Sequence, residues 1–172
     1  LVNVVGSSLA RMADSVFYLH VGPEIGVAST KAYLGMLVSQ LVIAKHWDAE
    51  NKLDVSFDEI AELPKLIDHT MACEGQIKEI SEKIYKKNDI YFIGRGLDYA
   101  LAAEGALKLK EISYLHAEAL AAGELKHGTL ALIEKGTPVI VTASQNHLLD
   151  KTTSNVQAVS YTHLRAHETS TD

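Results

Sequence analysis

A run of strand-forming residues that passes through glycines into a long helix pattern does most to limit how this chain folds. Residues 90–93 are apolar or aromatic, residues 94–96 read Gly-Arg-Gly, and residues 98–114 follow a helical period. Such a strand, turn and helix is the building unit of parallel α/β sheets. Residues 138–142 supply another short strand, so the sequence predicts an α/β fold.

The first part of the chain shows the same alternation less completely. Residues 1–5 and 16–19 are predicted strands, each followed by a turn that contains glycine. Residues 29–47 are predicted to form a helix, with Ser29 and Thr30 as candidate N-cap residues and an apolar face broad enough to be buried. Because residues 2–5 already read as a strand and the chain begins with leucine, we expect further sequence upstream.

An amphipathic helical stretch separates the two α/β parts. From about residue 57 to residue 87, isoleucine and leucine recur at helical spacing among charged residues, with Pro64 near a helix start. We therefore predict the end of one α/β domain at residues 1–53, a helical connector at 54–80 and the beginning of a second α/β domain at 81–159.

Charge and cysteine content narrow the class of ligand and the compartment. The chain has 16 Lys and Arg against 22 Asp and Glu, and no basic stripe, which argues against nucleic acid and anionic membrane surfaces. The apolar stretch at 33–44 is shorter than the roughly 20 residues that span a bilayer. With Cys73 as its one cysteine and no secretory leader pattern, the chain is expected to be cytoplasmic and to bind a small molecule.

Two glycine-containing segments resemble nucleotide-binding motifs only in part. Residues 94–99 have two of the three glycines of a dinucleotide fingerprint, with Tyr99 in the third place. Residues 26–31 place serine and threonine before the lysine, the reverse of a phosphate loop. We therefore expect no cofactor, and no metal site is expected either.

Three ionisable residues share one face of the predicted helix at 98–114. Glu104, Lys108 and Glu111 are four and three positions apart, which returns them to nearly one helical azimuth. Spacing alone favours an exposed ion-pair ladder. The surrounding alanine, leucine and isoleucine residues instead indicate partial burial, where desolvation and a nearby ammonium have opposed effects on a carboxyl pKa and can adjust a general base.

A histidine follows this helix in a polar turn. His127 precedes Gly128, and an imidazole there can accept or donate a proton. A lone histidine is more often structural, as we expect for His116, but the nearby carboxylate and ammonium groups make His127 a candidate catalytic residue.

Four segments together resemble the family of glutamine:fructose-6-phosphate aminotransferases (isomerising), also called glucosamine-6-phosphate synthases. They are EIGVASTKA at 24–32, EGALKLKEISY at 104–114, HAEA at 116–119 and AGELKHG at 122–128. The resemblance runs to about Val159 and implies parts of two doubly wound sugar-isomerase (SIS) domains joined by the helical connector. Residues 160–172 do not match, and we interpret them as a foreign tail.

The resemblance implies that the parent enzyme converts fructose 6-phosphate and glutamine to glucosamine 6-phosphate and glutamate, the first step of hexosamine biosynthesis. Glu111 resembles the base that moves a proton between C1 and C2 of the sugar, and His127 resembles the histidine that opens the sugar ring. Lys108 resembles the lysine at the C1 oxygen, and Glu104 resembles its supporting carboxylate. In the family the histidine reaches a neighbouring subunit, so a homodimer is implied.

The first domain is represented by fewer site residues. Val27, through its backbone, and Ser29 resemble the family's contacts to sugar hydroxyls, at a helix start expected to offer free backbone N–H groups. Thr129 departs from the proline usual in the family after the His-Gly pair. The family's phosphate loops and glutaminase cysteine lie upstream of Leu1, so the fragment alone is expected to be inactive.

Two alternatives stay open from the sequence. One is another SIS-superfamily enzyme, such as a sugar-phosphate isomerase or a deglycase. The other is a sugar-phosphate-binding SIS module without catalysis, which has no need of the set formed by Glu104, Lys108, Glu111 and His127.

Overall fold

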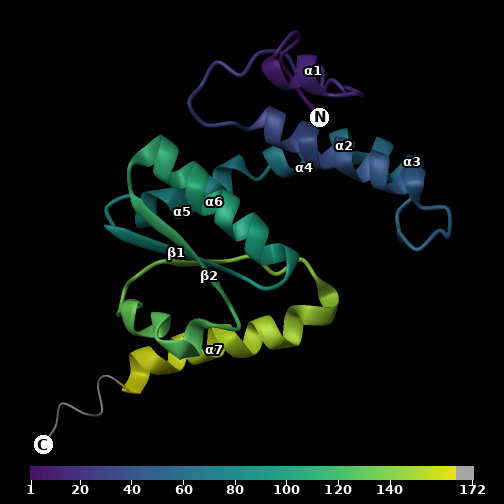
Figure 1. Ribbon diagram of the computed structural model, residues 1–172. Coiled ribbons are helices and arrows are strands. Elements are labelled where there is room, and N and C mark those ends of the chain that lie inside the picture. The colour runs from purple at the N-terminus through teal and green to yellow at the C-terminus, as the bar shows by residue number, and fades with distance from the viewer. Residues whose placement is uncertain (166–172) are drawn as a thin grey trace, which may run out of the picture. The chain divides into compact units, whose positions relative to one another are not determined.

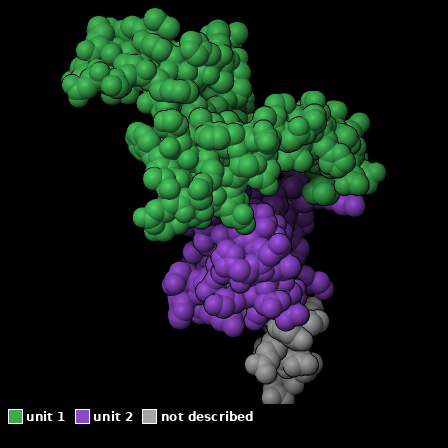
Figure 2. Space-filling model, turned by 90° about the vertical axis from the view of Figure 1, so that its right-hand side faces the viewer, with its two compact units in different colours: residues 1–82 green, residues 83–172 purple. Residues whose placement is uncertain are grey.

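The computed structural model describes residues 1–165 of the 172-residue chain and divides it into two compact units. Unit 1 comprises Leu1–Glu82, and unit 2 comprises Lys83–Asp172 (Figure 2). The division falls near the predicted end of the helical connector at residue 80, and the three predicted domain ranges stay a prediction. The tail predicted at 160–172 lies outside the described residues from 166 onward.

The N-terminal segment of unit 1 has one short helix and one backbone bridge. Helix α1 (Ser8–Met12) begins after Ser7, whose Oγ accepts from the Ala10 N–H at 3.3 Å. The strands predicted at 1–5 and 16–19 are wrong as strands, because only a single parallel bridge joins Val2 to Tyr18. A pair of extended segments needs further strands to build a sheet, and within the described residues of unit 1 no third strand pairs with them.

Helix α2 (Lys31–Trp47) confirms the helix predicted at 29–47, but not its burial. No residue of α2 is buried, so the predicted buried face is wrong in this structure. The helix is apolar on most sides, and few elements of unit 1 cover it; α3 is one that does. Such a helix is half-exposed rather than part of a closed core.

Three shorter helices cover the connector predicted at 54–80, and the last of them continues to Ile84. They are α3 (Phe57–Ala61), α4 (Leu63–Met71) and α5 (Glu74–Ile84), seen in Figure 1. A capping box begins α3, since Ser56 Oγ accepts from the Glu59 N–H at 3.1 Å and Glu59 Oε2 accepts from the Ser56 N–H at 2.7 Å. Pro64 lies in the first turn of α4, as the sequence predicted.

Unit 2 contains a parallel sheet of three strands. They are β1 (Asp89–Gly94), β2 (His116–Ala121) and β3 (Val139–Val141), in the order β2-β1-β3. Strand β1 pairs in parallel with both neighbours, from Asp89 opposite His116 onward and from Tyr91 opposite Val139 onward. The central strand was predicted, whereas β2 was not.

The two faces of β1 pack against different helices. Ile90 and Phe92 join Ala102 and Ala106 of α6 (Leu97–Ser113) in one buried cluster. Tyr91 and Ile93 point to the other face, where a second cluster includes Val159 of α7 (Leu149–Arg165). Figure 1 shows α6 and α7 on opposite sides of the sheet. This layering confirms the predicted α/β class.

Short 3-10 helices and a buried carboxylate shape the ends of the strands. They are η1 (Leu125–His127), η2 (Thr129–Leu132) and η3 (Asn146–Leu148). Asp98, 1% exposed, accepts hydrogen bonds from the Ser144 N–H at 3.0 Å and the Ser144 hydroxyl at 2.5 Å. Gln145 Nε2 donates to the Arg95 carbonyl at 2.8 Å. These bonds fasten the loop after β3 to the turn between β1 and α6.

Candidate active site

Three of the predicted site residues lie together on helix α6. Lys108 Nζ is 2.6 Å from Glu111 Oε2 and 3.4 Å from Glu104 Oε1. Steps of four and three residues along a helix bring side chains onto one face, so a single element positions all three groups. The α6 cluster, as we call Glu104, Lys108 and Glu111, is therefore present as the sequence predicted.

Partial burial distinguishes the α6 cluster from a surface ion pair. The side chains of Glu104, Lys108 and Glu111 are 24%, 20% and 27% exposed. The pair between Lys65 of α4 and Glu62, the residue before that helix, is 77% and 57% exposed, as a solvated pair usually is. The electrostatic interactions of the α6 cluster are consequently less screened by water and salt.

The charge balance of the α6 cluster favours a protonated Lys108. The hydrogen bond to Glu111 raises the pKa of Lys108, burial opposes this less strongly, and the charges of Glu111 and Glu104 add to the increase. Glu111 binds Lys108 through Oε2, and its Oε1 makes no hydrogen bond within the described residues. One carboxylate oxygen is thus able to accept a proton from a ligand.

His127 lies on the loop that follows β2. The Ala122 N–H donates to the Gly94 carbonyl at 2.9 Å, and the fully buried Leu125 anchors the loop on the core that includes Tyr91. The His127 imidazole is exposed, and within residues 1–165 it makes no hydrogen bond or ion pair. His127 and the α6 cluster therefore both lie in unit 2, and within the described residues no hydrogen bond or ion pair joins them.

Val27 and Ser29 lie in unit 1, on the loop before α2. Val27 is exposed, while the Ser29 hydroxyl donates to Glu24 Oε2 at 3.3 Å. The same carboxylate oxygen accepts from the Ala32 N–H at 3.1 Å and the Thr30 N–H at 3.4 Å. The expectation of free N–H groups at this helix start is therefore wrong for these two amides.

The capping expected of Ser29 and Thr30 also needs correction. Thr30 holds the N-cap position of α2, but its side chain makes no capping hydrogen bond. Glu24 supplies the acceptor instead, from eight residues before Ala32. Sequence reasoning missed Glu24 because the capping-box rule looks for an acidic residue inside the first turn, and α2 has none there. The sequence does contain one indication of this role: Glu24 follows Pro23 and precedes a helix that has no acidic residue in its first turn.

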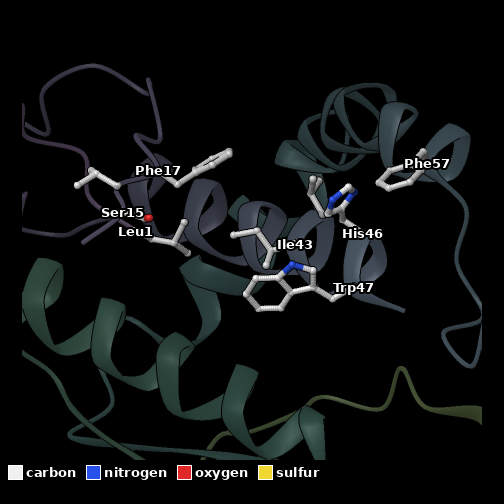
Figure 3. A pocket seen from close by; sticks show the side chains of 9 residues that line it. Leu1, Ser15, Phe17, Ile43, His46, Trp47 and Phe57 are labelled. Atoms are coloured by element: carbon white, nitrogen blue, oxygen red, sulfur yellow. The ribbon is translucent and has the colours of Figure 1, made fainter. Parts of the chain in front are cut away.

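An apolar pocket lies elsewhere in unit 1 and contains none of the predicted site residues. It has a volume of about 550 Å³, and Figure 3 shows Phe17, Ile43 and Trp47 among the side chains around it. His46 is its one imidazole. Within residues 1–165, no group of three or more His, Cys, Asp or Glu residues could hold a metal ion, and no helix is long and apolar enough to cross a membrane.

Comparison with known proteins first defines the class. Residues 83–162 match the SIS domain family, and this range contains the three-stranded sheet, α6 and the loop of His127. The chain thus carries an SIS domain of parallel α/β type.

Longer matches then define the particular family. The chain is 50% identical over 166 residues to the glutamine–fructose-6-phosphate aminotransferase (isomerizing) of Clostridium perfringens, and 49% identical over 159 residues to that of Pyrococcus horikoshii. These alignments cover 92% and 91% of this chain and 27% of each relative. These alignments confirm the resemblance seen in the motifs: over most of its length, the chain is similar to a segment of these aminotransferases.

A solved structure agrees with this assignment. The C-terminal domain of glucosamine-fructose-6-phosphate aminotransferase from Francisella tularensis is 43% identical, with a TM-score of 0.76, over 92% of this chain and 47% of that chain. The chain therefore spans about a quarter of the length of its full relatives and about half of this domain.

Proposed function

We propose that this chain is part of an enzyme that makes glucosamine 6-phosphate and glutamate from fructose 6-phosphate and glutamine. The α6 cluster carries this proposal, because it combines a partly buried ammonium with a carboxylate that has one oxygen unbonded within residues 1–165. The names of the relatives, which describe isomerizing aminotransferases, support the same reaction.

Proton transfer is the step that this cluster suits. Moving a proton between C1 and C2 of an aminated sugar needs one base that faces both carbons, and Glu111 Oε1 is the proposed base. Lys108 keeps its proton beside Glu111 and is proposed to act on the C1 oxygen, where charge develops. Glu104, 3.4 Å from Lys108, is proposed to hold that ammonium in place.

The remaining site residues complete the proposal. His127 is proposed to open the sugar ring, acting in the site of a neighbouring subunit of a homodimer, and its exposed side chain supports such a role. Val27 and Ser29 are proposed to bind sugar hydroxyls. A sugar phosphate is the proposed ligand.

A graft tests the function and the base together. Residues 1–159 would replace the matching segment of the Clostridium perfringens relative, and glucosamine 6-phosphate would be measured with fructose 6-phosphate and glutamine. We expect activity from the graft. Glu111→Gln should slow turnover by roughly a hundredfold or more while sugar-phosphate binding stays nearly unchanged, because a general base contributes about this much.

The decisive readout is exchange of the C1 proton of the sugar phosphate with solvent. Glu111→Gln should slow this exchange, whereas Glu79→Gln, the same change on an exposed face of α5, should leave it unaltered. Exchange at the unsubstituted rate in the Glu111→Gln graft would exclude Glu111 as the base. An unsubstituted graft that binds the sugar phosphate without turning it over would contradict the proposed reaction.

A further inference from the structure

Glu24 collects its hydrogen bonds from a single loop in unit 1. Its Oε2 accepts from the Ala32 N–H, the Thr30 N–H and the Ser29 hydroxyl, and its Oε1 accepts from the Thr30 hydroxyl at 3.5 Å. These bonds span five to eight positions of sequence. They fold residues 24–32 around one carboxylate, with Val27 exposed at the outside of the loop.

The carboxylate of Glu24 is ionised at neutral pH. Its bond from the Ala32 N–H lowers its pKa, burial opposes this, and the bonds from Thr30 and Ser29 and the charge of Lys31 lower it further. An ionised carboxylate accepts hydrogen bonds and has none to donate. In the contact between Glu24 and Ser29, the hydroxyl must therefore be the donor.

This arrangement decides what Ser29 can offer to a ligand. A serine hydroxyl has one proton and two acceptor lone pairs. Because the proton is directed to Glu24, the Ser29 oxygen is left with acceptor capacity only. A ligand that contacts Ser29 must itself supply a donor, as a sugar hydroxyl does.

The same loop disfavours an anion at this point. A helix N-terminus commonly binds phosphate through free N–H groups, but Glu24 already takes up the Thr30 and Ala32 amides at the start of α2. A phosphate or carboxylate oxygen near Ser29 would face acceptor lone pairs and the negative charge of Glu24. Both effects exclude acceptor-only ligand groups.

We propose that Glu24 is a positioning residue that orients the Ser29 hydroxyl as an acceptor, so that this loop selects a hydroxyl group of the sugar rather than its phosphate. The inference rests on the proposed function, because it takes the sugar phosphate as the ligand. It adds Glu24, which acts through Ser29 and does not itself touch the ligand, to the residues that determine specificity.

A double-mutant cycle tests whether Glu24 acts through Ser29. The graft carrying Glu24→Gln, Ser29→Ala or both would be titrated with fructose 6-phosphate by calorimetry. Ser29, Thr30 and Ala32 all donate to Oε2, so Gln either offers a neutral and weaker acceptor oxygen at that position or places its N–H₂ there and turns the Ser29 hydroxyl around. We expect each single change to weaken binding about five- to tenfold, as loss of one hydrogen bond does. The double variant should bind no more weakly than Ser29→Ala alone.

A matched control separates positioning from helix capping. Glu59→Gln removes a carboxylate that accepts from Ser56 at the start of α3, so it weakens a helix cap far along the chain from Ser29. It should leave fructose 6-phosphate binding unchanged. If the effects of Glu24→Gln and Ser29→Ala multiply in the double variant, or if Glu59→Gln weakens binding equally, the inference is wrong.

A structural readout stays independent of the proposed function. In ¹⁵N spectra of the 172-residue chain, the Thr30 and Ala32 amide signals should shift with a pKa below 4.5 and lose this titration in Glu24→Gln. Amides that do not titrate would overturn the assignment of Glu24 even if the graft is active. An unsubstituted graft that fails to bind fructose 6-phosphate would contradict the proposed function and the ligand assigned to Ser29.

Discussion

The carboxylates of this protein differ in what satisfies their oxygens, and this difference separates structural from chemical roles. Asp98 receives N–H and hydroxyl donors on both oxygens and is buried. Glu111 receives one ammonium on Oε2 and keeps Oε1 unbonded within the described residues. A fully satisfied carboxylate fixes the backbone around it, whereas a partly satisfied one can still accept a proton.

We predict that Asp98→Asn lowers the stability of unit 2 at neutral pH. The amide N–H₂ would replace one of the two accepting oxygens, so either the Ser144 hydroxyl must reverse its bond or the Ser144 N–H loses its acceptor, and the charge-assisted bonds are lost in both cases. The bonds from Ser144 lower the pKa of Asp98 below its ordinary 3.8, burial opposes them, and bonds from Gln145 add to the decrease. The stabilising contribution is therefore complete above about pH 3.8 and is lost as pH falls through the lower native pKa.

Urea unfolding followed by circular dichroism, from pH 2 to pH 7, would measure this effect. The Asn variant should show a lower unfolding midpoint at pH 7 and a flatter pH dependence below pH 4. Asp68→Asn, on the exposed side of α4, is the matched control and should change neither. Equal midpoints for Asp98→Asn and the unsubstituted chain at pH 7 would contradict the structural role.

Contacts between residues close in sequence could be predicted, whereas contacts between residues far apart in sequence could not. Helical spacing alone brings Lys108 to Glu104 and Glu111, so the α6 cluster was predictable. The bond from Ser144 to Asp98 spans 46 positions, and no local pattern indicates such a contact. Glu24 is nearer to its partners but outside the spacing of known capping motifs, so it was missed as well.

Among the strands, too, those with a clear local sequence pattern were predicted and those that depend on distant partners were not. The predicted strand at 90–93 lies within β1, because its four residues are buried on both faces and therefore read as an apolar run. Strand β2 mixes buried and exposed positions and includes the exposed His116 and Glu118. It therefore has no apolar run, and it was not predicted from the sequence. The strands predicted at 1–5 and 16–19 had strand-like residues but no sheet to join.

We predict that Gly94→Ala destabilises unit 2 strongly, because Gly94 is where β1 meets α6. A Cβ at Gly94 would lie 2.2 Å from the Asp98 carbonyl oxygen and 2.5 Å from the Tyr99 nitrogen. Neither atom is a flexible side-chain end, so the first turn of α6 must move. Overpacking of this kind costs about 1–3 kcal/mol or more in the free energy of unfolding.

Gly75→Ala is the matched control for this substitution. Apart from its chain neighbours and the backbone of its own helix, no atom lies within 4 Å of the position of a Cβ at Gly75, and alanine favours the helical conformation of α5. This change should leave the free energy of unfolding unaltered or raise it by up to about 1 kcal/mol. Chemical denaturation of both variants would compare them, and a Gly94→Ala chain as stable as Gly75→Ala would show that the turn is not constrained.

The whole chain concentrates its core in unit 2. Among the buried apolar residues that the structure describes, Ile60 belongs to unit 1 and the others lie between Ile90 and Val159. Large apolar side chains such as Met12 and Trp47 remain exposed in unit 1. Because burial of apolar surface is the main stabilising contribution to folding, the two units should differ in local stability.

We predict that hydrogen exchange of the 172-residue chain is uneven for this reason. Amides of β1 and β2 should exchange slowest, since their strands carry the fully buried Ile90, Ile93 and Ala117, and amides of residues 1–30 should exchange fastest. Mass spectrometry of peptides after timed exposure to D₂O measures both. Ile93→Ala should then remove much of the protection of β1, because deleting a buried isoleucine side chain costs about 2–5 kcal/mol. Equal protection of residues 1–30 and β1 would mean that unit 1 is stabilised by something other than buried apolar surface.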